Sequence, residues 1–386
     1  MFPSFYEFFL KTFGLDWPVM GMFKTFGFFM VMGFAVGYLI VYRAFRKREK
    51  AGVFLPEPVI EIVGAPASIF ELAISGFFGF ILGYKGVWAA QNWEMMVDRP
   101  EAVIFSATGV LWAGIVGAIL SIAFGYWEKN RLRLDTPVEK IVNYYPSDRV
   151  SELIFVAALW GILGAKVLAS VTEWNDFVAD PLGSLLSFAG LTWYGGLIGG
   201  AIAVFIYAKR KKIPLLHLMD SAAPALILAY GVGRLGCHFS GDGDWGIANL
   251  AAKPSAMMPD WLWSYDYPNN VSNVGEAIAG CTGDYCRKLI EPVWPTSVYE
   301  FGMSLAIYGI LMSLSSKLKV PGCLFAVYLV FNGMERFFIE FYRVTDKVGM
   351  GLSQAQFIAI FLMLLGVAAF LFLRSRGVSE QQTVME

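Results

Sequence analysis

The sequence predicts an all-α polytopic membrane protein. Of its 386 residues, 57% are hydrophobic and only 16% are charged, whereas a soluble domain carries about a quarter charged residues. Long apolar runs recur along the chain, and about 20 apolar residues are enough to cross the hydrocarbon of a bilayer. The formal net charge is −1, so composition gives no reason to expect nucleic acid as a partner. We therefore treat residues 1–386 as a single integral membrane domain.

The first 19 residues are predicted to be an interfacial segment rather than a cleaved leader. Residues 1–14 (MFPSFYEFFLKTFG) lack a basic n-region and a small-residue cleavage site. Their aromatic and polar residues recur at helical spacing, which is typical of a short helix on a membrane surface. We expect segment 1–19 to lie in the interface and the first membrane span to begin near Met20.

Nine runs are long enough to span a membrane, at about 20–42, 68–89, 103–127, 151–171, 187–208, 217–237, 296–316, 321–342 and 354–373. Basic residues cluster after the odd-numbered runs, and such clusters mark the cytoplasmic side. We therefore expect an outer N-terminus, a cytoplasmic tail at 374–386 and a long outer loop at 240–295. The clusters are Arg43–Lys50, Lys129–Lys140, Lys209–Lys212, Lys317–Lys319 and Arg374–Arg376.

An internal repeat relates two pairs of these runs. Residues 79–85 (GFILGYK) match 160–166 (WGILGAK) at an offset of 81, which also pairs Trp112 with Trp193. We interpret 68–127 as an extra helix pair that repeats 149–208 in the same orientation. Small residues in both copies allow close helix packing. Only the second copy carries a polar tip, so we expect only that copy to contribute chemistry.

The stretch 229–246 (AYGVGRLGCHFSGDGDWG) passes from an apolar run into a glycine-rich acidic loop. Arg234 stands at the junction, where an unpaired arginine costs about a few kcal/mol. It is either a snorkelling arginine at an ordinary membrane exit or part of a functional site.

Further polar residues accompany it on the outer side. Cys281 and Cys286 lie in the outer loop, where a disulfide can persist, but the sequence leaves their pairing open. Four ionisable residues near the outer end of the eighth run are costly unless they are paired or functional. They are Glu335, Arg336, Glu340 and Arg343, of which Arg336 and Glu340 are i, i+4 neighbours.

Four segments occur in an order that matches one known family. They are 194–197 (YGGL), 233–246 (GRLGCHFSGDGDWG), 295–300 (PTSVYE) and 336–343 (RFFIEFYR). In these segments the chain resembles the prolipoprotein diacylglyceryl transferases, enzymes of the bacterial inner membrane. The segments look like the family's GGL segment, its G-R-x-G signature, its P-S-x-x-Y-E and its R-x-x-x-E-F-x-R. The resemblance covers about 150–373, and the first run more loosely.

The chain departs from the family pattern at several positions. Cys237, Ser240 and Asp242 stand where the family usually has Asn, Asn and Glu. Tyr194 stands where a histidine often precedes the glycines, and Phe26 replaces a tyrosine of the first run. The pair at 68–127 is additional to the family's usual seven spans, so the chain resembles an extended branch.

The resemblance implies transfer of diacylglycerol from phosphatidylglycerol to the lipobox cysteine of a prolipoprotein, with release of glycerol phosphate. A departing phosphate needs cations, and a planar guanidinium suits it best. Arg234 and Arg336 are therefore predicted to form a phosphate clamp. The implied partners are phosphatidylglycerol, prolipoprotein signal peptides and membrane lipids, with no cofactor and no metal.

The group that removes the thiol proton is left open by the sequence. His238 is a reasonable general base, although it is equally well explained as an interfacial histidine bonded to the backbone. Tyr194 is a poor base at neutral pH and better suited to donate to the phosphate or the glycerol. A carboxylate is the third option. Further substrate contacts are predicted for Gly195, Gly196, Ser240, Asp242 and Glu340.

Two other functions compete with this interpretation. The repeat is compatible with a transporter or flippase-like carrier, which would place its charged groups near the middle of the bilayer on broken helices. The departures at Phe26, Tyr194 and Cys237 are compatible with a lipid-binding member of the family that has no catalytic activity.

Overall fold

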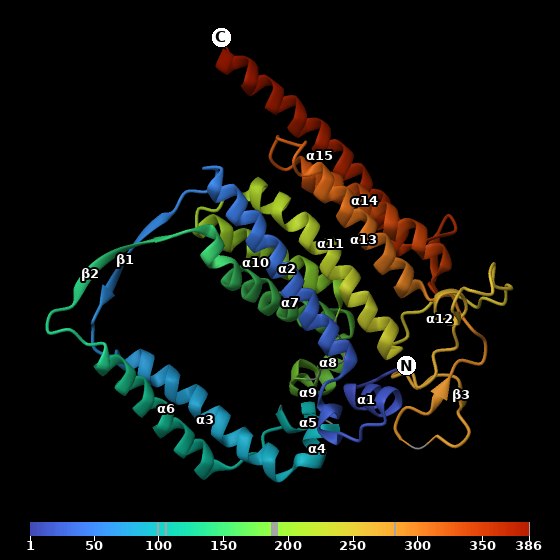
Figure 1. Cartoon of the computed structure of the whole chain (residues 1–386), viewed down its shortest axis with the longest axis horizontal. Coiled ribbons are helices and arrows are strands. Elements are labelled where there is room, and N and C mark those ends of the chain that lie inside the picture. The colour runs from blue at the N-terminus through green and yellow to red at the C-terminus, as the bar shows by residue number, and fades with distance from the viewer. Residues whose placement is uncertain (99, 105, 187–191, 282, 386) are drawn as a thin grey trace.

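The computed structural model describes residues 1–98, 100–104, 106–186, 192–281 and 283–385, and it is mostly helical (Figure 1). The outer ends of two expected spans, at 105 and 187–191, lie outside these residues. Among the described helices, seven are long and apolar enough to cross a membrane. They are α2 (Thr25–Lys50), α3 (Ile69–Gln91), α6 (Leu111–Arg131), α7 (Val150–Thr172), α11 (Leu215–Ser240), α13 (Thr296–Leu314) and α15 (Gln354–Met385).

The expected count of nine spans is not reached by this criterion. The two other expected spans are present as shorter helices, α10 (Trp193–Arg210) with 18 residues and α14 (Cys323–Ile339) with 17. The 3-10 turn η3 (Glu340–Tyr342) continues directly from α14. The polytopic all-helical membrane architecture predicted from the composition is confirmed.

Five helices form a bundle that carries Arg234, Glu300 and Arg336. In it α11 packs against both α2 and α13, and α14 packs against α15 (Figure 1). Glycines permit the closest approaches: a Cβ on Gly33 of α2 would lie 3.1 Å from the carbonyl oxygen of Ala229. A Cβ on Gly333 of α14 would lie 2.7 Å from that of Ala359. Small residues at such crossings are the usual means of bringing membrane helices together.

The two copies of the repeat form two similar helical hairpins. The first joins α3 to α6 through α4 (Trp93–Asp98) and α5 (Pro100–Ile104). The second joins α7 to α10 through α8 (Trp174–Ala179) and α9 (Pro181–Leu186). In each, a lysine near the end of the first helix bonds the connecting segment, Lys85 to the carbonyl of Val103 at 3.1 Å and Lys166 to that of Ser184 at 3.0 Å. Both partners are related by the offset of 81.

The second helices of the two hairpins, α6 and α10, correspond at an offset that is one residue larger than the 81 of the sequence match. A Cβ on Gly83 would meet the carbonyl of Ala113, and a Cβ on Gly164 would meet that of Gly195. The packing therefore equates Ala113 with Gly195, whereas the sequence match equated Gly114 with it. The α3–α6 hairpin lies to one side of the bundle (Figure 1).

A two-stranded ribbon, which the sequence analysis did not predict, connects this hairpin to the bundle. Strand β1 (Glu57–Val63) pairs antiparallel with β2 (Val138–Tyr144), so that Pro58 faces Asn143. Strand β1 follows α2 and β2 precedes α7. The segment that leads out to the hairpin and the segment that leads back from it therefore run side by side (Figure 1). The β-branched residues of 57–63 (EPVIEIV) were the available signal for a strand.

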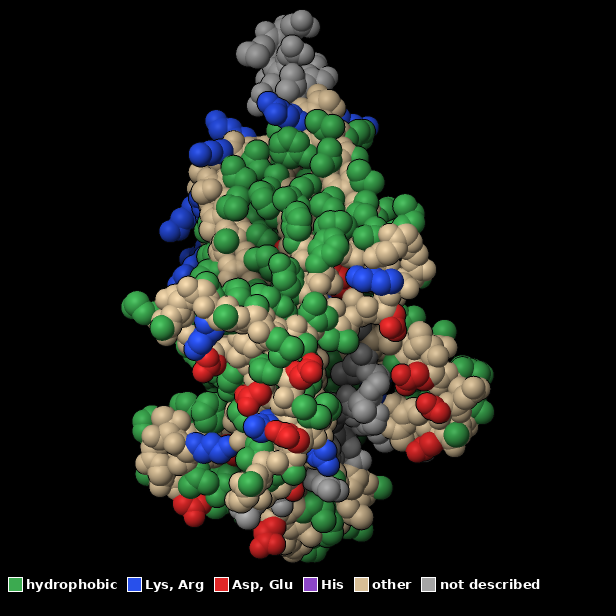
Figure 2. Space-filling view, turned by 90° about the vertical axis from the view of Figure 1, so that its right-hand side faces the viewer, with side chains coloured by type: hydrophobic (Ala, Val, Ile, Leu, Met, Phe, Trp, Pro, Cys, Tyr) green, Lys and Arg blue, Asp and Glu red, His purple; other side chains and the backbone are tan. Residues whose placement is uncertain are grey.

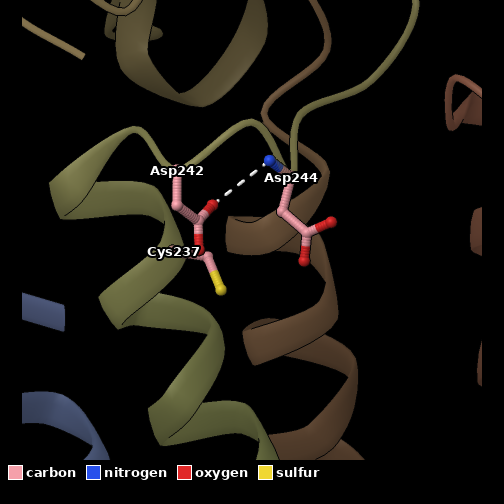
Figure 3. A group of neighbouring side chains, drawn as sticks. All are labelled: Cys237, Asp242 and Asp244. Carbon is pink, nitrogen blue, oxygen red and sulfur yellow. Dashed lines mark hydrogen bonds between the residues drawn. The ribbon is translucent and has the colours of Figure 1, made fainter. Parts of the chain in front are cut away.

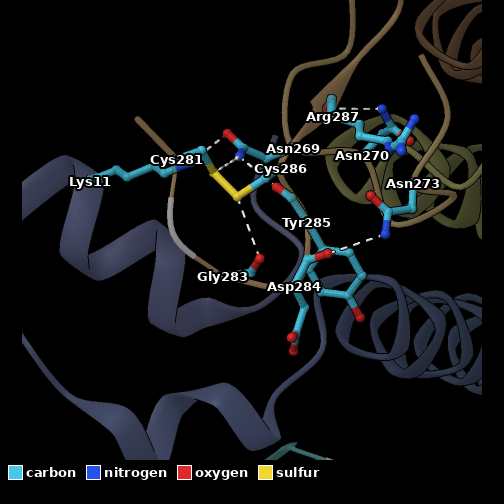
Figure 4. The surroundings of a disulfide bond; sticks show 10 residues. All are labelled: Lys11, Asn269, Asn270, Asn273, Cys281, Gly283, Asp284, Tyr285, Cys286 and Arg287. Atoms are coloured by element: carbon cyan, nitrogen blue, oxygen red, sulfur yellow. Dashed lines mark hydrogen bonds between the residues drawn. A yellow bond between two sulfur atoms is a disulfide. The ribbon is translucent and has the colours of Figure 1, made fainter. Parts of the chain in front are cut away.

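The remaining short elements precede the first long helix or lie in the segments that connect the long helices. They are α1 (Phe5–Phe13), η1 (Pro18–Met22), η2 (Pro146–Arg149), α12 (Asp260–Trp263), and the short pairs β3 (Glu276–Ala277) with β4 (Arg287–Lys288) and β5 (Lys347–Gly349) with β6 (Leu352–Ser353). The loop 240–295 has its own small core of Tyr267, Leu289 and Val293. Cys281 and Cys286 form a disulfide within it (Figure 4).

Candidate active site

Arg234 lies in the last two turns of α11 and is 9% exposed. Its Nη2 donates to Glu300 Oε1 at 2.6 Å, and its Nη1 forms an ion pair with Asp244. Its Nε donates to the hydroxyl of Tyr230, one turn earlier on the same helix, at 3.2 Å. Arg234 is therefore a paired arginine held by three partners rather than a snorkelling one.

The loop after α11 is shaped so that Asp244 returns to this arginine. Gly241 ends the helix with a positive φ of 67°, which favours glycine. The carbonyl of Asp244 then accepts hydrogen bonds from Thr296 at 3.2 Å and Ser297 at 2.9 Å, both at the start of α13. Gly246 passes so close to the backbone of Tyr342 that a Cβ would lie 2.5 Å from its carbonyl oxygen.

Glu300 is the hub of the site. It is the last residue of the PTSVYE segment, lies in the first two turns of α13 and is fully buried. Its Oε1 accepts from the hydroxyl of Tyr230 at 3.0 Å and contacts three guanidinium groups. These belong to Arg234, Arg336 at 3.6 Å and Arg343 at 3.3 Å.

Arg336, Glu340 and Arg343 extend this network at the end of α14. Arg336 Nη2 contacts Glu340 Oε2 at 3.0 Å, which confirms the i, i+4 pair expected from the sequence. Arg343 also forms an ion pair with Asp244, the carboxylate that binds Arg234. Glu340 is 1% exposed, whereas the side chain of Arg336 keeps 31% of its surface exposed.

The geometry brings the two predicted clamp arginines together. Arg234 and Arg336 reach the same oxygen, Glu300 Oε1, so their nearest nitrogens are separated by no more than the sum of those two contacts. All three arginines lie in the terminal turns of their helices or just beyond them. The described network thus sits at one end of the bundle and not at its middle.

Asp242 and Asp244 lie on either side of a tight turn, with Cys237 beneath them (Figure 3). Burial raises the pKa of Asp242, which accepts the Asp244 N–H at 3.2 Å and a hydrogen bond from the Cys237 thiol. Burial would also raise the pKa of Asp244, but the charges of Arg234 and Arg343 outweigh it and hold that pKa below its usual value.

The same three side chains have the donor types of a metal site. Their ligand atoms lie within 4.8 Å of one another. The oxygens of Asp244, however, already bind two guanidinium groups, and those two positive charges would repel a cation. The arrangement fits a negatively charged ligand beside the arginines better than a metal ion.

His238 and Ser240 face other partners. The Nδ1 of His238 lies 3.2 Å from the hydroxyl of Tyr267, and its ring contacts Trp261 and Tyr265. Ser240 donates to the carbonyl of Gly236 within its own helix at 2.8 Å. None of the described hydrogen bonds or ion pairs links either residue to Arg234, so the proposed roles of both stay predictions.

The YGGL segment contributes to the second hairpin. A Cβ on Gly195 would meet the carbonyl of Gly164, and one on Gly196 would lie 3.4 Å from that of Gly161. These glycines therefore let α10 pack closely against α7. Within the described part of the chain, Tyr194 forms no hydrogen bond with the arginine network. Its predicted role, and those of Gly195 and Gly196, also stay predictions.

Four residues of the network were not among the predicted site residues: Tyr230, Asp244, Glu300 and Arg343. Tyr230 was missed because it looks like an ordinary aromatic residue of an apolar run. Glu300 was considered only as the last residue of the PTSVYE segment. Its position as a carboxylate near the start of the apolar helix α13 was nevertheless a usable signal. Among the described residues, the buried atoms without a hydrogen-bond partner include Glu300 Oε2, Ser304 Oγ and Glu335 Oε1. Glu340 Oε2 and Arg343 Nε also lack one, but both take part in ion pairs.

Comparison with known proteins places this arrangement in a family. The model of a family described as prolipoprotein diacylglyceryl transferase matches residues 100–372. The chain belongs to the prolipoprotein diacylglyceryl transferase family. The match begins inside the α3–α6 hairpin and takes in all of the arginine network.

Three relatives of the family illustrate the likeness. The phosphatidylglycerol–prolipoprotein diacylglyceryl transferase of Dehalococcoides mccartyi strain 195 is 28% identical over 281 residues, which are 72% of this chain and 95% of the relative. That of Staphylococcus aureus strain MSSA476 is 28% identical over 71% of this chain and 89% of the relative. The second such enzyme of Clostridium perfringens strain 13 is 28% identical over 61% and 83%.

Proposed function

We propose that this protein is a transferase that moves the diacylglyceryl group of phosphatidylglycerol to the lipobox cysteine thiol of prolipoproteins. Glycerol phosphate is the leaving product, and the reaction is the first step of bacterial lipoprotein maturation. The names of its relatives support this function. Within this chain, the observation that carries the proposal is the convergence of three arginines on one oxygen of Glu300.

The network provides a binding site for the phosphate of the lipid. Arg336 is the arginine best able to engage it, because its side chain is 31% exposed and reaches Glu300 only at 3.6 Å. Arg234 is fixed by its carboxylate partners and can stabilise the charge that grows as the phosphate leaves. A preorganised donor of this kind contributes on the order of 10²–10³ to the rate.

The protein is a multi-pass membrane protein, and we place it in the bacterial inner membrane with the site at the outer leaflet. The N-terminus is then periplasmic and the C-terminus cytoplasmic. Figure 2 supports this orientation, since Lys and Arg gather at one edge of a broad apolar surface and most visible Asp and Glu lie beyond its other edge.

The terminal position of the network favours a transferase over a carrier. A carrier needs its charged groups near the middle of the membrane, on interrupted helices. The described charges of the bundle's site instead lie within the last turns of α11 and α14 and the first turns of α13. A lipid entering from the bilayer can present its phosphate there while its acyl chains stay in hydrocarbon.

The test is a transfer reaction in nanodiscs that contain phosphatidylglycerol. Purified protein receives a lipobox peptide, or the same peptide with serine in place of cysteine, and glycerol phosphate release and peptide mass are followed. We expect release and the diacylglyceryl mass increase only with the cysteine peptide. Arg234→Ala should lower the rate on the order of 10²–10³-fold.

A matched control is Arg287→Ala, which removes an exposed arginine of the outer loop that donates to a backbone carbonyl at 2.8 Å. It should keep the full rate. The proposal fails if the wild type releases no glycerol phosphate above the level of Arg234→Ala.

A further inference from the structure

Glu335 is a buried carboxyl group at the site, and no arginine of the network forms a described ion pair with it. It lies in the last two turns of α14, directly before Arg336, and is 3% exposed. Its Oε1 is buried and has no hydrogen-bond partner. Among the described residues no ion pair reaches either of its oxygens, whereas Asp244, Glu300 and Glu340 each bind at least two arginines.

The surroundings of Glu335 place it beside the proposed phosphate site. Six ionisable groups from four parts of the bundle lie within electrostatic range of its carboxyl. They are Tyr230 and Arg234 of α11, Glu300 of α13, Tyr328 and Arg336 of its own helix, and Arg343 beyond η3. Arg234 and Glu335 lie in the last two turns of α11 and α14, and Glu300 lies in the first two turns of α13, so the three groups share one layer at the same end of the bundle.

The transfer reaction needs a proton acceptor in that layer. A thiol attacks as the thiolate, so a neighbouring group has to take its proton. An arginine next to a carboxylate favours the ionised form and makes that carboxylate a poor proton acceptor. This argument sets aside Asp244, Glu300 and Glu340. His238 is also less suitable, because one of its nitrogens is directed to Tyr267 among aromatic rings.

We propose that Glu335 is the general base that removes the proton from the lipobox thiol, an inference that rests on the proposed function. The S–H bond breaks and its proton goes to the Glu335 carboxylate. The sulfur forms a bond to the glyceryl carbon, and the bond from that carbon to the phosphate oxygen breaks. Its electron pair leaves with glycerol phosphate, which the arginines stabilise. Glu335 then returns the proton to the departing phosphate.

Asp242 is the competing carboxylate, because it too makes no described ion pair. It lies in the loop beyond the end of α11, accepts the N–H of Asp244 and stands next to Cys237 (Figure 3). It is thus farther out than Arg234 and Glu300, whereas the reacting glyceryl carbon lies on the membrane side of the phosphate. Asp242→Asn is therefore the comparator for the experiment.

The experiment measures kcat and KM for phosphatidylglycerol across pH 5.5 to 9 for wild type, Glu335→Gln, Glu335→Asp and Asp242→Asn. Each protein is assayed with a cysteine lipobox peptide and with its selenocysteine counterpart. A selenol is already ionised at neutral pH and needs no base. With the cysteine peptide, Glu335→Gln should lower kcat on the order of 10²–10⁴-fold and leave KM within about threefold.

The selenocysteine peptide separates a base from a structural residue. If Glu335 is the base, the selenol should restore most of the rate of Glu335→Gln, and Glu335→Asp should keep partial activity with cysteine. The selenol should give Asp242→Asn no larger gain in rate than it gives the wild type. The inference is wrong if Glu335→Gln is equally slow with both peptides, or if the selenol rescues Asp242→Asn instead. A wild type that transfers to neither peptide would instead refute the proposed function itself, and the inference with it.

Discussion

In the bundle, buried charges contact one another across three helices, whereas in each hairpin a lysine bonds the backbone of its own connecting segment. Arg234, Glu300 and Arg343 come from three separate parts of the chain, and each pairs with a residue far away in the sequence. Lys85 and Lys166 reach carbonyls that lie 18 residues away within the same hairpin. A hairpin of this kind carries its own polar contacts with it, so it can be copied or inserted as a unit. The bundle network cannot be assembled without all of its helices.

The largest effect should come from removing the hub of the network. Glu300→Gln leaves the three arginines without their shared negative charge in a buried layer. Breaking one side of a buried ion pair costs about 3–5 kcal/mol. We expect a clearly lower thermal unfolding temperature in nanodiscs, together with loss of measurable transfer.

The matched control lies in the first hairpin. Glu71 pairs with Lys129 at 2.8 Å, but both side chains are nearly half exposed. Exposed pairs of this kind contribute little to stability, so Glu71→Gln should change neither unfolding nor transfer by much. If the two substitutions had equal effects, the contrast between bundle and hairpin would be wrong.

A second buried carboxylate of the bundle should affect stability without affecting chemistry. Asp220 of α11 is 6% exposed and accepts the N–H groups of Gly322 at 2.8 Å and Phe325 at 2.9 Å, at the start of α14. It satisfies helix-end donors that α14 cannot satisfy itself. Asp220→Asn should cost about 1–2 kcal/mol of unfolding free energy. The kcat of the folded variant should stay near that of wild type, and a strong fall in kcat at unchanged stability would contradict this structural role.

The sequence predicted those features whose residues lie close together along the chain, and it missed most contacts between distant segments. The spans, the repeat and the four polar segments are local patterns, so they were accessible. Arg336 and Glu340 were paired correctly because they are helix neighbours. No periodicity relates residues on three helices. Only the family resemblance therefore suggested that Arg234 and Arg336 lie together, and their shared contact with Glu300 was seen only in the structure. The ribbon β1–β2 was missed because 74 residues, an entire hairpin, separate the paired ends Val63 and Val138 of its two strands.

Two aspartates of the bundle's loop should respond to pH in opposite directions. The pKa of Asp242 is raised by burial, so its protonated form favours the fold and stability is lost as the pH rises through that pKa. The pKa of Asp244 is lowered by Arg234 and Arg343, so its contribution is lost as the pH falls through it. The Asp242→Asn variant should therefore unfold at a higher temperature than the wild type once the pH exceeds the ordinary aspartate pKa of about 4. Asp244→Asn should be less stable than the wild type at neutral pH and should approach the stability of the wild type only in acid. Parallel curves of unfolding temperature against pH for the two variants would refute the opposite pKa shifts of Asp242 and Asp244.

The smallest effect should come from removing the first hairpin altogether. Pro58 and Asn143 are partners across the ribbon, so an Asn-Gly turn between them can replace residues 59–142 without moving either end. The shortened ribbon keeps the ion pair between Glu57 and Arg149 at 2.9 Å. Among the described contacts, it loses the hairpin itself, the hydrogen bond from Tyr144 to Glu61, and the packing of α4 on η1, where Val97 lies beside Gly21. Tolerance of such an excision depends on the burial and bonding of the backbone that is cut, and we expect transfer to stay within about twofold of the full chain. A much slower excised protein that still unfolds cooperatively would mean that the hairpin takes part in handling a substrate, and that it is not only a self-contained copy of α7–α10.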